Sequence, residues 1–311
     1  MTAAAVVEVD GLTHRYGDRV ALRDVRFDVR AGEIFGLLGP NGGGKTTLFR
    51  ILATLLRPTS GTARLFGLDV VASPARARER IAVVFQSPSV DRKLTVRENL
   101  MHQGHLYGLR GADLRARIAA MLERMGLADR ARDRVESLSG GLRRRVEIAK
   151  ALLHEPGCLL LDEPSAGLDP GARLDLRRQL EELRARERMT ILLTTHHLEE
   201  AAACDRLAIL SKGERVALGA PEALKAELGG DVVTIVAREP ETLRDAIASR
   251  FGAAPRVVDG ALRLERDRGH ELVASLADAF PGRIDSITVG KPTLEDVFIR
   301  KTGHRFWEDG A

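Results

Sequence analysis

The sequence predicts an α/β protein built on a mostly parallel sheet, followed by a small α+β domain. Three observations predict this. Short apolar runs that are typical of buried strands alternate with helical stretches through most of the 311 residues. A glycine-rich loop joins one of these strands to a helix. The hydrophobic rhythm changes near residue 225, just before a Gly229-Gly230 break.

The elements of the larger part follow from hydrophobic periodicity. Two N-terminal runs alternate apolar and polar residues, which predicts strands, and the later continuous apolar runs predict strands buried on both faces. Residues 95–136, rich in Leu, Met, Ala and Arg, are expected to be helical. In the helix over 172–188, Leu176, Leu180 and Leu183 share one face. The strands are expected at 5–16, 20–32, 33–39, 80–86, 158–164 and 190–197, and further helices at 45–56 and from 140 to the break at Pro156-Gly157.

The last part has a different order of elements. Strands are expected at 231–237 and 283–290, a hairpin over 255–265, and helices over 241–252, 270–280 and 293–303. Asp259-Gly260 marks the hairpin turn, since this dipeptide favours the backbone that two-residue turns need. The resulting β-α-β-β-α-β order suggests a small ferredoxin-like domain. We therefore predict two domains, 5–225 and 228–311.

Composition and charge narrow the class of protein. Apolar residues make up 44% and charged residues 30%, and the net charge is only +4, so the chain is globular. Arginine-rich stretches such as residues 74–81 are expected on solvated helix faces, and aromatics are scarce, so no nucleic-acid partner is expected. Cys158 and Cys204 are expected to be buried free thiols. With no basic leader and no apolar run of roughly 20 residues, the chain is predicted to be cytoplasmic, and a membrane role would need a partner.

A phosphate-binding loop is the strongest motif. It has the form G-x-x-x-x-G-K-[ST], follows an expected strand and opens an expected helix. Its backbone N–H groups and the helix N-terminus would cradle phosphates. Lys45 would reach the β- and γ-phosphates, and the Thr46 hydroxyl would bind Mg²⁺. The loop consists of Gly39, Pro40, Asn41, Gly42, Gly43, Gly44, Lys45 and Thr46.

Polar residues end three of the other expected strands. Asp162 would hold Mg²⁺ beside the loop, and Glu163 would polarise the attacking water as a general base. His196 and His197 follow the strand "ILLTT", and a histidine there could donate to the γ-phosphate. Gln86 follows "RIAVVF". The carboxyl ends of parallel strands meet at one edge, where ligands bind in open α/β sheets.

Together these residues resemble the ATP-binding subunit of an ABC transporter, over about residues 5–225. The resemblance implies a P-loop NTPase core with an antiparallel β subdomain, a mostly parallel sheet and a helical subdomain. It adds Thr47 to the phosphate loop and makes Gln86 the Q-loop residue that contacts metal and water. It implies that Tyr16 stacks on adenine and that His196 is the switch histidine. "LSGG", with Ser139, Gly140 and Gly141, is similar to the family's signature motif, and Asp169 in "SAGLDP" to its D-loop.

Within that family the chain is similar to the daunorubicin-resistance type of drug-efflux subunit. "LTVRENLMHQGHLYGL" and "PTLEDVFIRKTG" carry this resemblance, and a C-terminal accessory domain is common in the type. The chain departs from the family at Leu142, where the signature usually continues with glutamine, and at His197, a position often aromatic or acidic. Because His196 directly follows the Thr-Thr pair, it is the preferred switch histidine.

The resemblance implies a motor subunit that uses ATP and Mg²⁺. Two copies, or this chain and a related ATPase, would close head to tail on two ATP molecules. Each site would take Ser139, Gly140 and Gly141 from the opposite chain. A separately encoded six-helix permease would hold the chain on the inner face of the cell membrane, with its coupling helix docked near residues 95–125. The expected cargo is a drug or other small molecule.

Two alternatives remain open from the sequence. A soluble ABC-type ATPase switch in DNA repair or translation would share the motifs. Repair types insert a long coiled coil between the phosphate loop and the signature, however, and ribosome-associated types carry two cores; this chain has neither. The C-terminal domain could sense a ligand, or lengthen a dimer interface and steady the ATPase. The second role is favoured, because no polar cluster in its sequence indicates a pocket.

Overall fold

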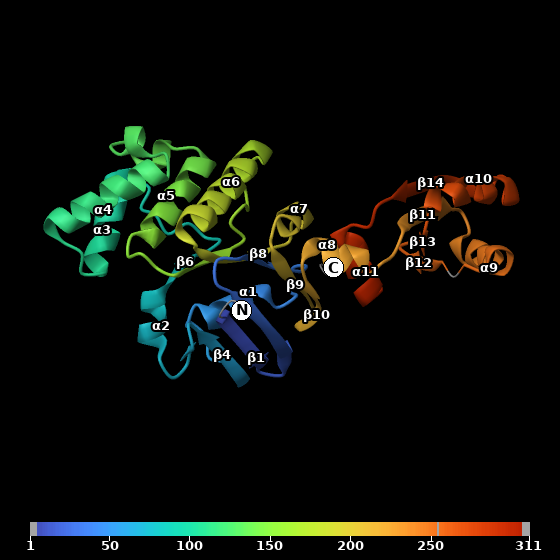
Figure 1. Ribbon diagram of the computed structural model, residues 1–311, viewed down its shortest axis with the longest axis horizontal. Coiled ribbons are helices and arrows are strands. Elements are labelled where there is room, and N and C mark those ends of the chain that lie inside the picture. Colours follow the sequence, from blue (N-terminus) through green and yellow to red (C-terminus); the bar gives the residue numbers. More distant parts are fainter. Residues whose placement is uncertain (1–4, 254, 307–311) are drawn as a thin grey trace. The chain divides into compact units, whose positions relative to one another are not determined.

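The computed structural model describes residues 5–253 and 255–306. The first four residues, which begin the N-terminal stretch in which no leader was expected, and the end of the predicted C-terminal domain lie outside the described residues. Contacts divide the chain into two compact units, Met1–Arg215 and Val216–Ala311. The division falls inside strand β10 (Glu214–Gly219), which belongs to the central sheet of the first unit (Figure 1). The predicted division between residues 225 and 228 stays a prediction.

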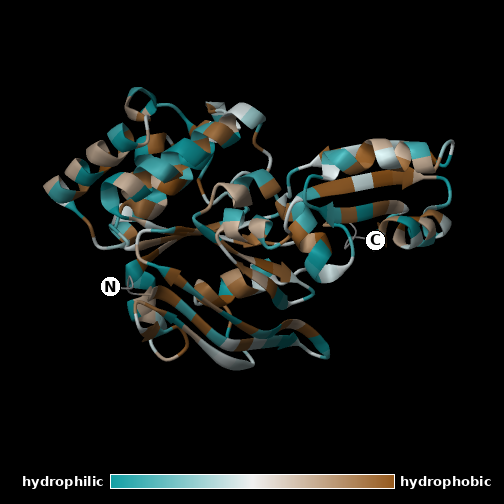
Figure 2. Ribbon diagram, turned by 45° about the vertical axis from the view of Figure 1, so that its right-hand side comes forward, coloured by the Kyte–Doolittle hydropathy of each residue, from teal (hydrophilic) through white to brown (hydrophobic). Residues whose placement is uncertain are grey.

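The first unit is built on a six-stranded sheet with strand order β10-β9-β3-β8-β7-β6. Strand β3 pairs in parallel with β8 and β9, and β7 pairs in parallel with β6 and β8. Every residue of β3, β7 and β8 is buried, as expected for parallel strands covered on both faces, and the apolar strands show as brown ribbons in Figure 2. The predicted parallel sheet is confirmed. Besides β10, the strands of this sheet are β3 (Ile34–Leu38), β6 (Ile81–Val84), β7 (Cys158–Asp162), β8 (Thr190–Thr195) and β9 (Arg206–Ser211).

A second sheet of the first unit is antiparallel. Its order is β2-β1-β4-β5, and β1 pairs with both β2 and β4. Burial alternates along β1, since one face packs inward and the other meets solvent. The strands are β1 (Ala5–Tyr16), β2 (Arg19–Arg30), β4 (Ser60–Leu65) and β5 (Leu68–Asp69).

Helices cover the central sheet and form a helical region. A capping box between Thr95 and Glu98 starts the first helix of that region. One continuous core joins these helices to β7, and Leu176, Leu180 and Leu183 are buried in it, as predicted. The helices are α1 (Lys45–Leu52), α2 (Pro74–Arg80), α3 (Val96–Leu106), α4 (Gly111–Arg124), α5 (Gly140–Leu152), α6 (Pro170–Glu187) and α7 (Leu198–Ala202), with 3₁₀ turns at Ala128–Arg130 and Val135–Ser137.

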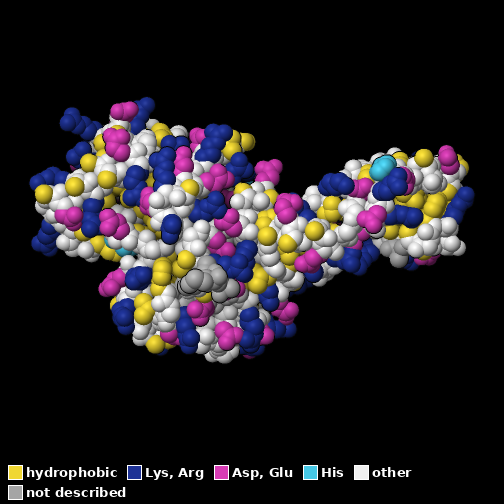
Figure 3. Space-filling model, viewed as in Figure 1, with side chains coloured by type: hydrophobic (Ala, Val, Ile, Leu, Met, Phe, Trp, Pro, Cys, Tyr) yellow, Lys and Arg dark blue, Asp and Glu magenta, His cyan; other side chains and the backbone are white. Residues whose placement is uncertain are grey.

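Surface and burial agree with the composition. The arginines of α2 are exposed, whereas Cys158 and Cys204 are buried free thiols. Lysine and arginine side chains are interspersed with aspartate and glutamate on the face drawn in Figure 3. Among the residues that the structure describes, no helix is both long enough and apolar enough to cross a bilayer.

The second unit carries a four-stranded sheet of order β12-β13-β11-β14, whose neighbouring strands pair antiparallel. Asp259 and Gly260 both have positive φ, 52° and 70°, so the predicted hairpin turn is confirmed. The element order β-α-β-β-α-β is as expected; the ferredoxin-like assignment stays a prediction. The elements are α8 (Pro221–Ala226), β11 (Asp231–Ala237), α9 (Pro240–Phe251), β12 (Arg256–Val258), β13 (Ala261–Arg266), α10 (Gly269–Ala279), β14 (Ile284–Gly290) and α11 (Leu294–Thr302).

Candidate functional site

The glycine-rich loop connects β3 to α1, and its glycines are needed where the backbone is crowded. Gly44 has φ of 101°, and a Cβ there would lie 2.8 Å from the carbonyl oxygen of Ala21. A Cβ on Gly39 would lie 2.4 Å from the carbonyl oxygen of Leu210. Any side chain at these two positions would therefore displace backbone, which explains why the tight curl of the loop requires glycine.

Lys45 begins α1 and folds back over the loop. Its Nζ donates to the carbonyl oxygens of Gly39 at 2.7 Å and Pro40 at 2.9 Å, and lies 3.8 Å from Oε1 of Glu163. Burial lowers the pKa of Lys45, and the nearby Glu163 and Asp162 carboxylates oppose this. The ammonium is thus held between the loop and the end of β7, where a phosphate chain in the loop would meet it.

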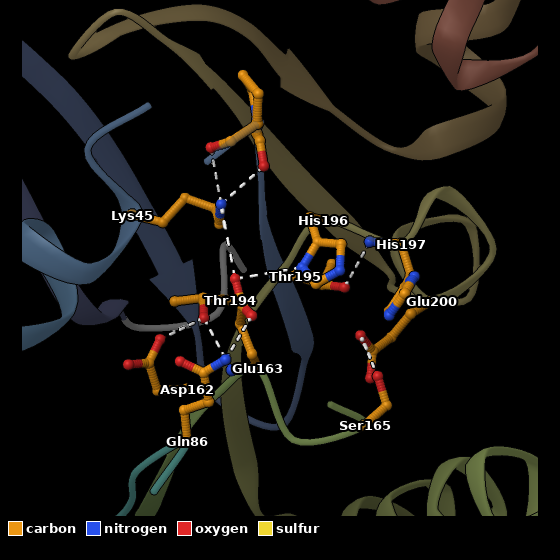
Figure 4. Close-up of polar contacts among 12 residues, drawn as sticks. Lys45, Gln86, Asp162, Glu163, Ser165, Thr194, Thr195, His196, His197 and Glu200 are labelled. Carbon is orange, nitrogen blue, oxygen red and sulfur yellow. Dashed lines mark hydrogen bonds and ion pairs between the residues drawn. The ribbon is translucent and has the colours of Figure 1, made fainter. Parts of the chain in front are cut away.

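Glu163 is the centre of a polar cluster at the carboxyl edge of the sheet (Figure 4). Its carboxylate accepts from Gln86 Nε2 at 3.1 Å and lies 3.2 Å from Nδ1 of His196. Its φ is +43°, an uncommon value for a residue with a side chain, and its N–H donates to Thr194 Oγ1 at 3.0 Å. Lys45, Gln86 and His196 therefore surround one carboxylate. They come from three other segments of the chain: the start of α1, the turn after β6 and the end of β8.

Three of these residues lie beyond the strands in which the sequence placed them. Strand β6 ends at Val84, β7 at Asp162 and β8 at Thr195, so Gln86, Glu163 and His196 belong to the segments that follow. The left-handed backbone at Glu163 is incompatible with a continuing strand. The expected meeting of these side chains at one edge still occurs, because the turns leave from neighbouring strands.

Asp162 is buried beside Glu163, and the Thr194 hydroxyl forms hydrogen bonds with both residues. Thr194 Oγ1 donates to Asp162 Oδ1 at 2.6 Å and accepts from the Glu163 N–H. Burial raises the pKa of Asp162, and the Thr194 hydrogen bond opposes this rise. Thr194 was not among the site residues predicted from the sequence. A hydroxyl side chain in an otherwise apolar strand, ending at the same edge, is the pattern that could have identified it.

The two histidines behave differently. His196 contacts Glu163, whereas the His197 N–H donates to Thr195 Oγ1 at 2.9 Å, and the two rings lie 4.1 Å apart. Burial lowers the pKa of His197, as do its neighbours His196 and Arg173. This geometry favours His196 as the switch histidine, although its role in catalysis stays a prediction.

A pocket of about 280 Å³ lies over the loop. Tyr16, 46% exposed, stands at its wall, where a flat ring could stack on a base. Arg19 and Arg50 also line it, and neither was predicted from the sequence. The remaining lining residues are Ala21, Asn41, Gly42, Gly44, Lys45, Thr46, Thr47 and Glu163.

Ser139 and Asp169 line a second pocket, of about 370 Å³, which shares no residue with the first. Ser139 caps α5 by accepting from the Leu142 N–H at 3.3 Å, and Asp169 caps α6 by accepting from the Ala172 N–H at 2.9 Å. Gly141 and Leu142 line the same pocket. The chain thus brings Ser139, Gly141 and Asp169 together, but apart from its own phosphate loop.

A buried ion pair on α5 connects these regions. Arg144 Nη1 donates to Glu147 Oε2 at 2.7 Å, and both side chains are almost fully buried. Arg144 also donates at 2.9 Å to the carbonyl oxygens of Phe85 and Pro164, on either side of the Gln86–Glu163 contact. Arginine runs were expected to be solvated, so for Arg144 that expectation is wrong. Besides Glu147, its polar partners are backbone carbonyls from distant turns.

Comparisons with known proteins agree with this arrangement. Residues 22–166 match the family model described as "ABC transporter". A Nod factor export ATP-binding protein I from Paraburkholderia xenovorans is 41% identical over 96% of this chain and 97% of its own length. The chain belongs to the ABC transporter family.

Other members of the family support its place among the ATP-binding subunits. A daunorubicin resistance ATP-binding protein, DrrA3 of Streptomyces coeruleorubidus, is 38% identical over 97% of each chain. The structure of CbiO1 from Clostridium perfringens, part of an ABC transporter complex, superposes with a TM-score of 0.68, 27% identity, and coverage of 80% of this chain and 96% of that one. The chain is therefore an ABC ATPase, and ATP is its nucleotide.

Proposed function

We propose that this ABC ATPase powers the export of a small molecule or drug through a separate membrane permease, with Glu163 as its catalytic base. The observation that carries the proposal is the Glu163 carboxylate, held by Gln86 and His196 within 3.8 Å of Lys45 at the phosphate loop. A general base needs such placement near the reacting phosphoryl group. ATP hydrolysis requires stabilisation of charge on that group more than covalent chemistry.

The residues near Asp162 fit Mg²⁺. Mg²⁺ takes oxygen ligands and commonly uses one or two carboxylates together with substrate phosphates. Thr46, Gln86 and Asp162 offer a hydroxyl, an amide oxygen and a carboxylate, and Thr194 occupies only Oδ1 of Asp162. When bound, the ion would neutralise charge on the phosphates. Among the described residues, no group of three acidic, histidine or cysteine side chains is placed to hold a metal ion.

Each residue of the site then has its own role in ATP binding and hydrolysis. Tyr16 stacks on adenine, and the backbone from Gly39 to Thr47 cradles the phosphates. Lys45 exchanges the Gly39 and Pro40 carbonyls for phosphate oxygens. Glu163 accepts a proton from the attacking water, and His196 donates to the γ-phosphate.

We also propose that Ser139, Gly140 and Gly141 act on the ATP of a second copy or of a related ATPase. The separation of the Ser139 pocket from the phosphate loop within one chain supports this. Two chains closing head to tail would bring the start of α5, with its N–H groups and partial positive charge, to the partner's γ-phosphate. Asp169, in the same pocket, would lie at that interface.

The transport role and the partner rest on the relatives. Two of them, 38% and 41% identical, are named for daunorubicin resistance and Nod factor export. A permease would supply the membrane path, would dock its coupling helix near α3 and α4, and would hold the ATPase on the inner face of the membrane. Purification of the native protein with a six-helix membrane protein would support this role. Co-purification with nucleic acid or ribosomes alone would favour the soluble ATPase switch.

The base assignment is tested by Glu163→Gln. The amide keeps the shape and the contacts with Gln86 and His196 but accepts no proton. We expect ATP binding to persist, turnover to fall by about 100-fold or more, and the protein to accumulate as an ATP-bound dimer in size-exclusion chromatography. Glu182→Gln, at an exposed position on α6, is the matched control and should keep normal turnover. Turnover close to normal in Glu163→Gln would show that Glu163 is not the base.

A further inference from the structure

The C-terminal unit contains a basic pocket that the sequence did not reveal. It has a volume of about 400 Å³, within the range of small-molecule sites. Arg256, Arg263, Arg266 and Arg300 line it together with Glu265. The expectation that this domain lacks a polar cluster is therefore wrong. The four arginines come from three elements, and only the fold assembles them.

The pocket lies at a gap in the edge of the sheet. The short edge strand β12 pairs with Ala261, Leu262 and Arg263, whereas β13 continues to Arg266. Beyond Arg263, β13 has no further partner in β12. Gly252, at the end of α9, and Arg300, near the end of α11, complete the wall of the pocket. A ligand entering here would meet the free edge of β13 as well as the side chains.

Two of the arginines are already paired. Arg263 forms an ion pair with Asp296, and Arg300 with Glu265, so helix α11 lies against the face of the sheet that carries Arg263. Leu262 and Leu264 point to the opposite face, where they pack into the core of the unit. These two pairs fix the walls of the pocket and neutralise half of its arginines.

The other two arginines have no ion pair with any residue that the structure describes. Arg256 donates only a long 3.5 Å hydrogen bond to the carbonyl oxygen of Arg300, and Arg266 is exposed. Arg256 lies directly opposite Arg263 in the β12–β13 register. Like charges directly opposite one another destabilise a strand pair. Counting Asp296, four positive charges stand against two negative ones, so two of the arginines have no opposite charge in or around the pocket.

We propose that this pocket, which we call the arginine pocket (Arg256, Arg263, Arg266 and Arg300), binds a phosphate-bearing compound. The planar guanidinium presents paired N–H donors that match phosphate oxygens, and two unpaired guanidiniums favour a multiply charged anion. The site is separate in sequence from the ATPase motifs and makes the C-terminal unit a ligand-binding module. The same chemistry is offered by a soluble phosphate compound and by a phospholipid headgroup.

Calorimetric titration with pyrophosphate tests the proposal in the full-length protein. Lys45→Ala is introduced first, to weaken binding at the phosphate loop. We expect saturable binding in this background, and an affinity at least tenfold lower after Arg256→Gln with Arg266→Gln. Arg238→Gln, an exposed position of the same unit outside the pocket, is the matched control and should leave the affinity unchanged.

Thermal unfolding of each variant establishes that it is folded, and Arg256→Lys with Arg266→Lys provides a second, milder change. The lysine pair keeps the charge but lacks the forked donors, so we expect it to weaken binding as well. No saturable binding, or equal affinity in the glutamine variant and its parent, would overturn the proposal. If the lysine variant and its parent bind pyrophosphate with equal affinity, the forked guanidinium donors are not needed. The pocket would then attract anions only by its positive charge, which would contradict a specific phosphate site.

Vesicle co-sedimentation separates the two sources of phosphate. Vesicles of phosphatidylcholine with phosphatidic acid are compared with phosphatidylcholine alone. Binding that needs phosphatidic acid, is competed by pyrophosphate and is lost in the glutamine variant supports a headgroup site. Pyrophosphate binding without vesicle binding supports a site for a soluble compound.

Discussion

At the scale of single residues, the hydroxyl of Ser139 has two possible uses. It accepts from the Leu142 N–H and thereby caps α5, which satisfies one of the free donors at the helix start. At 3.3 Å this is a long hydrogen bond, and the pocket in front of it is open. A hydroxyl that is weakly engaged in its own helix remains free to donate to an anion brought by another molecule.

Ser139→Ala separates these two uses. A role limited to capping predicts a loss of about 1 kcal/mol in the free energy of unfolding, with unchanged turnover. If Ser139 acts on a partner's ATP, we expect ATP still to bind while hydrolysis is lost. Nucleotide binding, steady-state ATPase activity and urea unfolding of the same preparation give the answer. Normal turnover at reduced stability would leave Ser139 as a cap only.

Leu142→Gln tests the departure from the usual signature. Leu142 packs against the core cluster of the first unit, so it contributes apolar contact instead of a polar one. Because Ser139 and the glycine N–H groups remain in place, we expect turnover to change by less than about threefold, less than the loss of a hydrogen bond to a charged group would cause. A much larger change in kcat would show that the residue after Gly141 contacts the partner's ATP directly.

At the scale of elements, the Arg144 side chain joins α5 by hydrogen bonds to the two turns that carry Gln86 and Glu163. Arg144 donates to carbonyls on either side of the Gln86–Glu163 contact and is neutralised by Glu147, which also accepts from the Ser89 N–H at 2.9 Å. Burial raises the pKa of Glu147, and the charge of Arg144 opposes this. The helix that begins at Ser139 therefore cannot shift without moving the turns that hold Gln86 and Glu163.

Arg144→Met should accordingly destabilise the protein by about 3–5 kcal/mol, because Glu147 is left as a buried unpaired charge. Adding Glu147→Leu removes that charge and should restore much of the stability. We expect turnover of the double variant to stay low, because the tie between α5 and the two turns remains broken. Urea unfolding and kcat with KM for ATP are measured together, and Arg178→Ala, exposed on α6, serves as control. If kcat recovers together with stability in the double variant, the Arg144–Glu147 pair contributes to stability only and not to turnover.

The elements themselves were largely predictable from the sequence, and their long-range pairings were not. Periodicity placed the buried strands, and Asp259-Gly260 placed a turn, because both are local properties of the chain. The strand-end clustering of Asp162, Glu163 and His196 followed from parallel topology. By contrast, the burial of Arg144 depends on carbonyls some 20 and 59 positions away. The arginine pocket likewise depends on strand register and on the position of α11.

At the scale of the whole molecule, the chain contains separate hydrophobic cores. The core of the first unit gathers the helical region and the strands around β7, and that of the second gathers residues of β11, β13, α9 and α10. Proteins with more than one domain core commonly depart from two-state unfolding. A ligand stabilises the unit that binds it, by an amount that its concentration and affinity determine.

Differential scanning calorimetry should therefore resolve two transitions. ATP at 100 times its dissociation constant adds about 2.7 kcal/mol to the unit that binds it, so only the transition of the first unit should move upward. Leu160→Ala and Leu276→Ala remove side chains that are 0% exposed in the first and the second unit, and each costs about 2–5 kcal/mol where it is buried. We expect each variant to lower one transition and leave the other in place. If pyrophosphate occupies the arginine pocket, it should raise the unfolding temperature of the second unit, which is the temperature that Leu276→Ala lowers. A single transition shifted equally by both variants and by ATP would mean that the two cores unfold as one cooperative unit.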